Sequence, residues 1–569
     1  MKVRAGLKWV LASAPLILVF QNGCSLNPAP KYARPPAPTP QAYKEAPPEF
    51  KEGNGWKLAA PGDDKIRPKW WEMYNDPLLN SLEEQVRISN QTIVAAEANY
   101  RASQAVVLSA RSGLYPTFGA SSSYTNARSS ATSRGGFVNS SSGTSSTGTT
   151  TGTTTGTTTG TSTGTGTSTG TTGTTSGTGT SSSSPINEFS LPLSVSYTVD
   201  LWHRVRNTIA ADAFQAQASA ADIQTALLSV QTQLADDYFE LRAVDAQRLI
   251  LQDTLKNYQD ALNLTTTLYK TGIDSEQEVT QAQVQFDSAN AQLTDLGVAR
   301  AQYEHAIAVL IGKPASAFEI QYGVFIPNPP QIPVAVPSEL LERRPDIAAL
   351  ERVIASDNAL IGVAKAAYYP NLTLSASGGL QTTSFTQWFT WPSRFWSLGP
   401  SFAETLFDGG ARRAAVQESE ANYDAAIANY RQTVLTSFQA VEDQLAASRI
   451  LSEEVVQQQR TINSSQHYLD LANIRFKTGV DSYLNVITAQ TTLLTNRETE
   501  VQVQLRQMTA SVQLILALGG GWDNSQLPQM KDILHSAPRN NQAPAGSETP
   551  VPPAPGYNPA PLPKTAPAP

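Results

Sequence analysis

The sequence predicts a mainly α-helical protein with a smaller β part. Three observations lead to this fold class: two long stretches without glycine or proline, several segments in which apolar and polar residues alternate, and a motif that occurs twice. The motif reads "KTGIDS" at 270–275 and "KTGVDS" at 477–482. The second copy follows the first by 207 residues, so the chain is organised as a repeat.

Glycine and proline are absent between Leu201 and Gly272 and again between Gly410 and Gly479. Because both residues interrupt helices, each stretch predicts one helix, which at ~1.5 Å per residue extends about 100 Å. Apolar residues recur at heptad spacing in both, which indicates antiparallel coiled-coil packing. They are Ile223, Leu227, Val230, Leu234 and Leu241 in the first helix and Val434, Phe438, Val441 and Leu445 in the second.

Shorter helices flank the long ones. A predicted helix follows each Lys-Thr-Gly turn, at 275–310 and 482–518, and a half-length helix precedes each long one, at 77–114 and 338–368. Two half-length helices together match one long helix, so each repeat is predicted as a long helix beside two shorter helices stacked end to end. Internal duplication of one unit explains this arrangement.

The two copies differ by an insertion. Equivalent positions lie 254 residues apart before the middle of the repeat and 207 after it, so the first copy carries 47 extra residues. The Ser/Thr/Gly-rich segment 127–186 lies at that point, and such a composition predicts a flexible, exposed loop. The expected organisation is a signal peptide at 1–23, an N-terminal lipoprotein segment at 24–76, a first repeat at 77–322, a second repeat at 323–523 and a disordered Pro/Ala-rich tail at 524–569.

Each repeat also contains two segments that alternate between apolar and polar residues and therefore predict strands. They lie at about 117–126, 189–200, 371–380 and 396–407, and Glu404 interrupts the apolar side of the last one. One apolar face, one Ser/Thr-rich face and a length of about ten residues suit a transmembrane β-barrel strand. Four strands cannot close a barrel and open edges are unstable in lipid, so the chain is expected to oligomerise.

The N-terminus predicts export and a lipid anchor. Basic residues precede an apolar stretch from Val10 to Phe20, which is the layout of a signal peptide. Cys24 is the only cysteine, and Gly23 before it fits a lipobox, whereas Gln21 and Asn22 do not. We expect acylation of Cys24 and, since no acidic retention signal follows, an outer-membrane location.

Composition excludes several function classes. A net charge of −7 without any basic block argues against nucleic-acid binding. The four histidines, His203, His305, His467 and His535, are scattered, so no metal site and no cofactor is expected. The sequence holds no Walker loop, no H-E-x-x-H motif and no clustered His/Asp/Ser set, which argues against an enzyme.

From Tyr32 to Trp522 the chain resembles the TolC/OprM-type outer-membrane efflux proteins, in particular the NodT-like lipoproteins of resistance-nodulation-division systems. The resemblance rests on the order of several motifs, among them "YARPP", "WWEMYNDPLLNSL", "VDLWHRVRN", "LFDGGARR", "RFKTGVDSYLNVITAQTTLL" and "LALGGGW". It implies a homotrimer in outer-membrane lipid, in which four strands per chain build a 12-stranded barrel and the helices build a periplasmic α-barrel. Its implied partners are a periplasmic adaptor (membrane fusion) protein and an inner-membrane resistance-nodulation-division pump.

In this family the Lys-Thr-Gly turns resemble the periplasmic tips of helical hairpins that dock the adaptor. The tip residues are Lys270, Thr271, Gly272, Ile273 and Asp274 in the first repeat and Lys477, Thr478, Gly479, Val480 and Asp481 in the second. Physically, the glycines can adopt positive φ and the aspartates can cap the helices that follow. Relatives carry gate carboxylates a turn or two past the second tip, where this chain has Asn485 and Thr488. Glu276 and Glu278 past the first tip are the candidate replacements.

The leading hypothesis is a passive duct of a tripartite efflux system that exports small toxic compounds. Two alternatives remain open at the level of sequence. A duct for polypeptide secretion would share the fold, and a coiled-coil surface lipoprotein would share the helices and display the Ser/Thr/Gly-rich loop.

Overall fold

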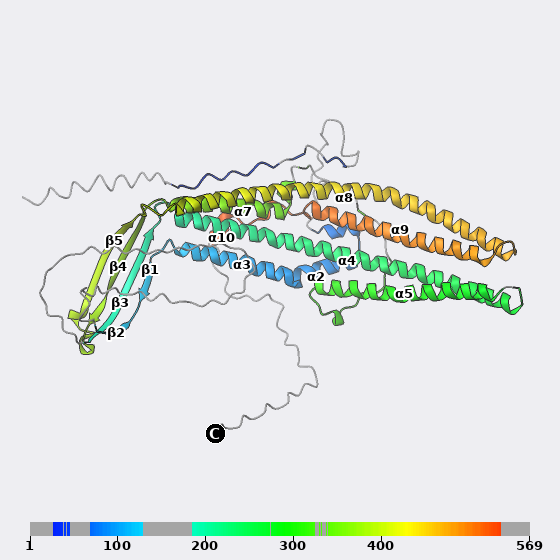
Figure 1. Ribbon diagram of the computed structural model, residues 1–569, viewed down its shortest axis with the longest axis horizontal. Coiled ribbons are helices and arrows are strands. Elements are labelled where there is room, and N and C mark those ends of the chain that lie inside the picture. The colour runs from blue at the N-terminus through cyan, green and yellow to red at the C-terminus, as the bar shows by residue number, and fades with distance from the viewer. Residues whose placement is uncertain are drawn as a thin grey trace, which may run out of the picture. The chain divides into compact units, whose positions relative to one another are not determined.

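The computed structural model describes residues 27–37, 39–40, 43–45, 69–128, 185–273, 275–324, 329–330, 332, 337 and 340–535. These residues form a helical unit and a sheet unit (Figure 1). The helical unit comprises the described residues of 1–114, 200–370 and 404–569, and the sheet unit those of 115–199 and 371–403. The chain is mainly helical with a small sheet, as its sequence predicts.

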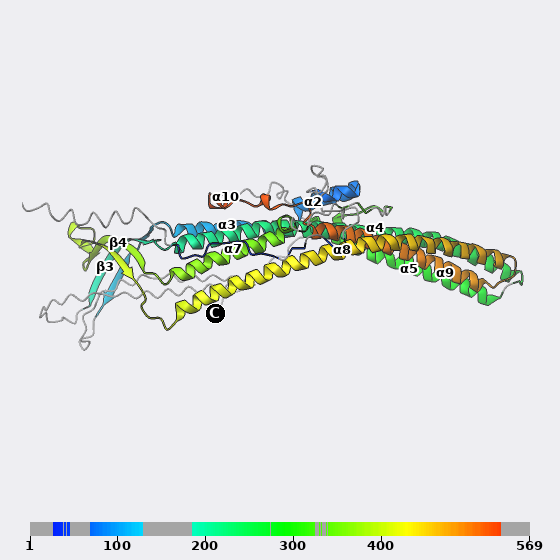
Figure 2. The same cartoon turned by 90° about the horizontal axis from the view of Figure 1, so that it is seen from above.

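Both predicted long helices are present, and each forms a hairpin with a shorter one. Helix α4 (Arg204–Lys270) is followed by α5 (Glu276–Leu310), and α8 (Ala411–Lys477) by α9 (Tyr483–Ala517). The helices of the second hairpin begin and end 207 residues after their counterparts. Helix α8 packs on α9, α9 on α4 and α4 on α5, and Figure 2 shows the four running together to the two tips.

The half-length helices are interrupted where the sequence analysis expected continuous ones. In place of a helix over 77–114 the structure has α2 (Pro77–Ser89) and α3 (Gln91–Ser112). The side chain of Asn90 between them accepts hydrogen bonds from the backbone N–H groups of Thr92 and Ile93, so it starts a new helix by capping it. The expected helix over 338–368 is likewise divided into α6 (Leu340–Arg343) and α7 (Pro345–Ala366), because proline favours the first turn of a helix.

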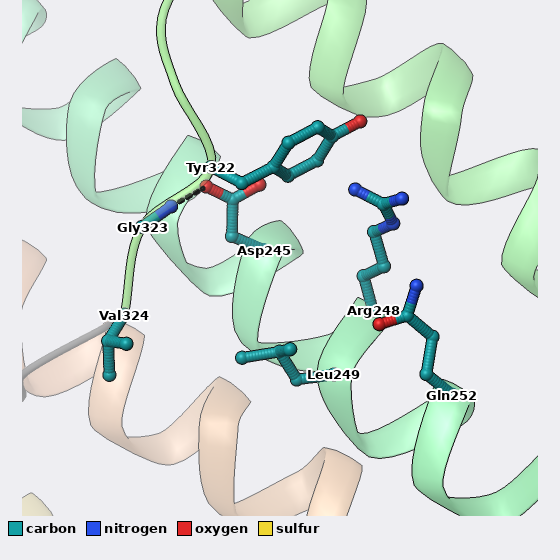
Figure 3. A pocket seen from close by; sticks show the side chains of 7 residues that line it. All are labelled: Asp245, Arg248, Leu249, Gln252, Tyr322, Gly323 and Val324. Carbon is teal, nitrogen blue, oxygen red and sulfur yellow. Dashed lines mark hydrogen bonds between the residues drawn. The ribbon is translucent and has the colours of Figure 1, made fainter.

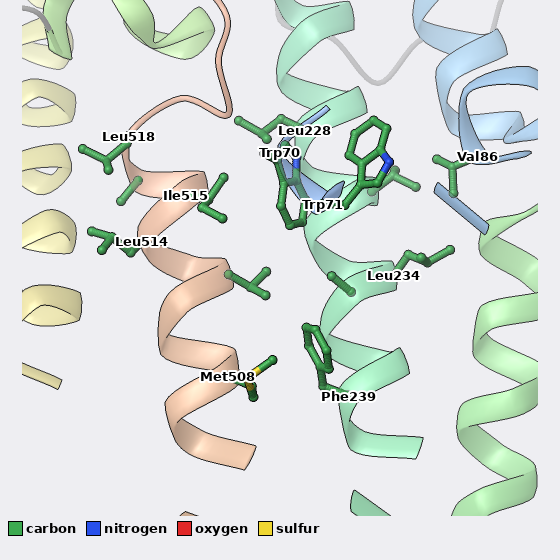
Figure 4. Close-up of a cluster of buried hydrophobic side chains, with 14 of the residues drawn as sticks. Trp70, Trp71, Val86, Leu228, Leu234, Phe239, Met508, Leu514, Ile515 and Leu518 are labelled. Carbon is green, nitrogen blue, oxygen red and sulfur yellow. The ribbon is translucent and has the colours of Figure 1, made fainter. Parts of the chain in front are cut away.

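The main hydrophobic core lies where the two hairpins meet the half-length helices. Trp70 and Trp71 of a short 3-10 helix, η2 (Trp70–Tyr74), pack there against α4 and α9 (Figure 4). The heptad prediction is confirmed for seven of its nine positions, which are buried: Val230, Leu234, Leu241, Val434, Phe438, Val441 and Leu445. Ile223 and Leu227 are only partly buried.

The C-terminal tail contains more structure than the sequence analysis expected. A 3-10 helix η7 (Asn524–Gln526) and a helix α10 (Met530–His535) lie within the segment predicted as disordered from 524. Ile533 is 1% exposed and packs with Val107 of α3 and Ile209 of α4. The proline-rich composition that supported the prediction begins only after this apolar turn.

A further 3-10 turn, η3 (Ala315–Ala317), follows α5.

The sheet unit is a single antiparallel sheet in the order β1-β3-β4-β5, with β2 also paired to β3. Its strands are β1 (Thr117–Ala120), β2 (Ser123–Ala127), β3 (Ile186–Val199), β4 (Asn371–Thr382) and β5 (Arg394–Ala403). Two 3-10 turns, η5 (Phe385–Gln387) and η6 (Trp391–Ser393), connect β4 to β5. Most of the expected insertion at 127–186 lies outside the described residues.

One predicted strand, 117–126, is divided by a proline on its neighbour. Strands β1 and β2 pair with β3 in one continuous register, and the gap between them lies opposite Leu191 and Pro192. Because proline has no N–H to donate, the ladder is interrupted there. On the other side Pro192 faces Gly379, where a Cβ would lie 2.1 Å from the Leu191 carbonyl oxygen, so only glycine fits.

The strand register gathers apolar side chains on one face and small polar ones on the other. Directly paired residues share a face of a sheet. Phe118, Val195, Ala376 and Leu398 are paired in a row across four strands, and so are Gly119, Ser194, Ser377 and Ser397. Much of the apolar face is exposed. Its exposed side chains include Phe118, Tyr124, Leu193, Leu374, Trp396, Leu398 and Phe402.

The end of the last strand differs from the prediction. Strand β5 stops at Ala403, whereas the sequence analysis expected it to reach residue 407. Glu404 therefore follows the strand and does not belong to its apolar face. Leu406, which continued the alternating pattern, is exposed beyond the end of the strand, as is Phe407.

Candidate functional site

The two Lys-Thr-Gly turns have the same backbone geometry. Helix α4 ends with hydrogen bonds from Gly272 N–H to the Tyr269 carbonyl and from Ile273 N–H to the Leu268 carbonyl, both 2.9 Å. Helix α8 ends with the equivalent pair from Gly479 N–H and Val480 N–H, also 2.9 Å. This is the Schellman motif, which requires a left-handed residue, and the two glycines have φ of 77° and 72°.

The repeated residues of the motif have direct structural reasons. The hydroxyl groups of Thr271 and Thr478 donate to carbonyls one turn earlier, which gives these helix-end carbonyls a second hydrogen bond beside the one from the turn backbone. The lysines place a positive charge at the negative end of the helix dipole. Lys270, Ile273, Lys477 and Val480 are all exposed. Each tip thus presents one cation and one aliphatic side chain on a rigid turn.

The predicted capping role of the tip aspartates is wrong for Asp481. Helix α9 begins after Ser482 without a side-chain cap, and the Asp481 carboxylate instead pairs with the Arg475 guanidinium at 2.5 Å. The Arg475 hydrogen bond, with a contribution from the Asn485 amide, holds the pKa of Asp481 below its usual value. Asp274, the equivalent residue of the first tip, lies outside the described residues.

The candidate gate residues lie in the first turn of the returning helices. Glu276 is exposed and Glu278 half-buried at the start of α5, and Asn485, which occupies the position equivalent to Glu278, is exposed on α9. The position equivalent to Glu276 is Tyr483, which is 2% exposed and packs on Phe476. The first tip therefore exposes the acidic group of Glu276 where the second has the aromatic anchor Tyr483.

A small apolar cluster beneath the tips holds the two hairpins of one chain together. It combines Ala282 of α5, Ala472 of α8 and Tyr483, Val486 and Ile487 of α9. The small side chains of Ala282 and Ala472 let α5, α8 and α9 approach closely. Any movement of one tip against the other has to disrupt this cluster.

Midway along the first hairpin lies a buried ionic network that the sequence analysis did not find. Asp245 accepts hydrogen bonds from Arg242 (3.1 Å), from Arg300 (3.0 Å) and from the Gly323 N–H (3.1 Å). Arg300 also pairs with Glu304 at 2.6 Å, and the two arginines donate to the carbonyls of Gln321 and Ile320. The network fastens the segment after α5 onto α4.

The same segment forms one wall of a cavity of about 310 Å³ (Figure 3). The Tyr322 ring lies between the guanidinium groups of Arg248 and Arg300, each 3.9 Å from the ring centre. The residues equivalent to Asp245 and Arg300 in the second hairpin are Ser452 and Gln507, so the network belongs to the first hairpin alone. This difference between the two repeats is the sequence signal by which the ionic network could have been found.

Helix α4 also carries an acidic group with an unusual pKa. Burial, opposed by a hydrogen bond from Gln513 and assisted by the neighbouring charges of Glu240 and Asp237, raises the pKa of Asp236 to about 7. The Gln513 amide lies 2.6 Å from the carboxylate. Asp236 therefore changes charge near neutral pH at the contact between the two hairpins.

Cys24 lies outside the described residues, but the segment that follows it is fixed on the helices. The Asn27 side chain accepts a hydrogen bond from Asn207, near the start of α4, at 2.9 Å. Farther along, the Tyr32 hydroxyl donates to Glu351 of α7 at 2.7 Å. This segment thus begins near the start of α4, the helix that follows β3 in sequence.

Within the described ranges no helix is long and apolar enough to cross a membrane. The same residues contain no group of three or more His, Cys, Asp or Glu side chains that could hold a metal ion.

The fold is that of outer-membrane channels. It resembles the solved outer-membrane channel OprN, with a TM-score of 0.70 and 24% identity over 88% of this chain and 100% of that chain. The CmeC outer membrane channel of Campylobacter jejuni gives a TM-score of 0.72 and 22% identity over 90% of this chain and 98% of that chain.

The sequence comparison identifies the family. The model of the outer membrane efflux protein family matches residues 157–313 and 336–520, and the chain belongs to this family. The Pseudomonas putida protein named solvent efflux pump outer membrane protein SrpC is 31% identical over 61% of this chain and 74% of its own length. The pyoverdine export outer membrane protein OpmQ of Pseudomonas aeruginosa is 28% identical over 83% of this chain and 91% of its own. Membership of the family places the chain in the outer membrane.

Proposed function

We propose that the chain is the channel subunit of a tripartite efflux system: a passive, trimeric duct that exports small toxic compounds from the periplasm or the pump to the exterior. The observation that carries the proposal is the division of the sheet into an apolar and a Ser/Thr-rich face, with edges that pair with no other described strand. Lipid accommodates the first face and a water-filled duct the second. Chemistry at the duct is unnecessary because the partner pump supplies the energy.

Closure of the duct requires several chains. Strands β1 and β2 share one line of the sheet, so each chain contributes four strand lines, and three chains supply the twelve of the proposed barrel. Joining the open edges between chains satisfies the backbone groups that lipid cannot.

The helical unit supports the same assembly. Helices α8 and α5 lie at the two ends of the row formed by α8, α9, α4 and α5. Both carry exposed aliphatic side chains, such as Val284 and Val298 on α5 and Ile450 and Leu471 on α8. We infer that α5 of one chain packs against α8 of the next, which closes the α-barrel. The matched lengths of the two hairpins are explained by internal duplication.

The tips are the proposed docking points for the periplasmic adaptor, with Lys270 to Asp274 and Lys477 to Asp481 as the contact residues. Rigid turns with an exposed cation and an exposed aliphatic side chain suit an interface of mixed chemistry. Three chains would present six tips to the adaptor, and the inner-membrane resistance-nodulation-division pump would act through it.

The lipid anchor is proposed at Cys24. Asn27, only three residues farther along the chain, is held near the start of α4, and β3 ends at Val199, five residues before that helix begins. An acyl chain on Cys24 would therefore start near the membrane boundary. Relatives named for solvents and for pyoverdine support small molecules as the exported class.

A matched pair of arginine substitutions tests the membrane assignment of the sheet. Leu398 and Ser397 are neighbours on β5 and lie on opposite faces. Leu398→Arg places a charge in lipid, at a cost of about 2–4 kcal/mol per chain near the midplane, and we expect a large loss of trimer from the outer membrane. Ser397→Arg should assemble normally and reduce cation conductance in planar bilayers. Equal assembly of both variants would contradict the assignment.

The gate proposal has its own test. Glu276 and Glu278 from three chains would converge on the duct and attract cations, so Glu276→Gln/Glu278→Gln should weaken the cation selectivity of single channels. Asn485→Asp, at the position equivalent to Glu278, should strengthen it. If neither variant alters selectivity while the wild type conducts, the gate does not lie at these positions.

A further inference from the structure

An apolar cavity with two arginines lies at the end of the helical unit that adjoins the strands in sequence. It has a volume of about 330 Å³, within the range of small-ligand sites. Leu114 from the end of α3, Ile209 and Ala210 from α4, and Met530 and Leu534 from α10 form its apolar lining. Arg111 and Arg206 supply the charges. The combination matches a molecule with an anionic head and an apolar tail.

The two guanidinium groups are incompletely paired. Arg111 donates to the backbone carbonyl of Leu534 and has no carboxylate partner among the described residues. Arg206 is largely exposed, lies 3.0 Å from His203, and its Nε is 4.0 Å from an Asp200 oxygen. That carboxylate already accepts the N–H groups of Val205 and of Arg206 itself. Both arginines can therefore accept an additional anion.

The position of the cavity in the chain indicates the source of that molecule. Leu114 precedes β1 by three residues, and Arg206 follows the end of β3 by seven. Nearby, the Trp202 ring stacks on the Tyr369 ring with 4.6 Å between the ring centres, and the Trp202 indole N–H donates to the Pro370 carbonyl. Strand β4 begins at Asn371, directly after Pro370. Tryptophan and tyrosine are enriched at membrane–water interfaces. On the proposed function, which puts the strands in the membrane, the cavity lies at its periplasmic boundary.

We propose that this cavity binds an anionic phospholipid of the periplasmic leaflet, with its phosphate between Arg111 and Arg206 and the start of an acyl chain against Ile209, Ala210 and Leu534. Charge distinguishes this occupant from the acyl chains of the Cys24 anchor, which carry no anionic group for the two arginines to bind. Charge-assisted bonds to phosphate are about twice as strong as neutral ones, so the arginines hold the head and α10 covers the tail.

Native mass spectrometry of the full-length trimer, titrated with phosphatidylglycerol, tests the proposal. We expect Arg111→Gln/Arg206→Gln to weaken lipid retention at least about tenfold, which corresponds to one lost charge-assisted contact. Arg204→Gln is the matched control, because Arg204 is exposed on the same turn and does not line the cavity. Ala210→Trp should also reduce retention by filling the cavity while leaving both arginines in place.

Three further measurements distinguish the lipid from other occupants of the cavity. Phosphatidylglycerol should bind far more tightly than glycerol phosphate, and Cys24→Ala should retain the lipid. The proposal is overturned if the double variant retains lipid as the wild type does, if glycerol phosphate binds equally well, or if deletion of residues 536–569 raises lipid binding. Conductance of the same preparations separates the two proposals: trimers that conduct without retaining lipid refute only the lipid site, and an absence of conductance refutes the channel.

Discussion

Asp245 is expected to be the residue on which the attachment of segment 318–324 to α4 depends. Its carboxylate is 2% exposed, and it neutralises Arg242 and Arg300, whose side chains are 9% and 10% exposed. Removing one partner of a buried ion pair costs about 3–5 kcal/mol, because it leaves an uncompensated charge. Glu304 still neutralises Arg300, so we expect Asp245→Asn to cost about 3 kcal/mol, at the lower end of that range.

Hydrogen exchange measures this cost locally. The Gly323 N–H donates directly to Asp245, and its exchange reports the opening of the segment. A loss of about 3 kcal/mol raises the opening constant roughly 100-fold. The control is Asp253→Asn on the same helix, where the carboxylate is 62% exposed and lies 3.5 Å from Arg497. Exposed ion pairs contribute about 0–1 kcal/mol to stability, so Asp253→Asn should raise the exchange rate of the Gly323 N–H at most about fivefold.

A double variant tests the electrostatic cause. Arg242→Gln/Asp245→Asn removes one buried positive charge together with the carboxylate, so its cost should be smaller than the sum of the two single costs by about 0.5–3 kcal/mol. Two results would refute the reasoning: strictly additive costs, or an exchange rate in Asp245→Asn no faster than in Asp253→Asn.

Two further predictions concern turns and protonation. Gly479→Ala should cost only about 1–2 kcal/mol for left-handed backbone, since no atom lies within 4 Å of the new Cβ, whereas Gly519→Ala adds a contact of 2.1 Å with a backbone carbonyl and should lower the unfolding temperature far more. If the two variants lowered the unfolding temperature equally, the close backbone contact at Gly519 would have no effect on stability. Asp236 has a folded-state pKa of about 7 against its ordinary 3.8, so the folded state holds the proton longer. Stability relative to Asp236→Asn should therefore fall as pH rises from about 4 to about 7, by up to about 1.4 kcal/mol per pH unit, and stay level above; a flat difference across that window would contradict the burial of this carboxylate.

Sequence by itself determined the features that depend on local rules. The absence of glycine and proline between Leu201 and Gly272 determined α4 to within a few residues, and heptad spacing identified three of its buried positions, Val230, Leu234 and Leu241. The Lys-Thr-Gly motif determined both turns, because a left-handed glycine and a capping threonine act within one helical turn. Alternation of apolar and polar residues likewise determined the two faces of the strands.

Tertiary structure decided what depends on residues far apart in the chain. The gap between β1 and β2 is set by Pro192 on another strand, and α10 is ordered because Ile533 finds an apolar site on α3 and α4. Even over six residues the structure decides between alternatives, because Asp481 pairs with Arg475 across the turn and so does not cap α9, although its sequence position allows either role. Asp245 and Arg300 are 55 residues apart, and only the packing of α5 on α4 brings their charges together in a place where water cannot screen them.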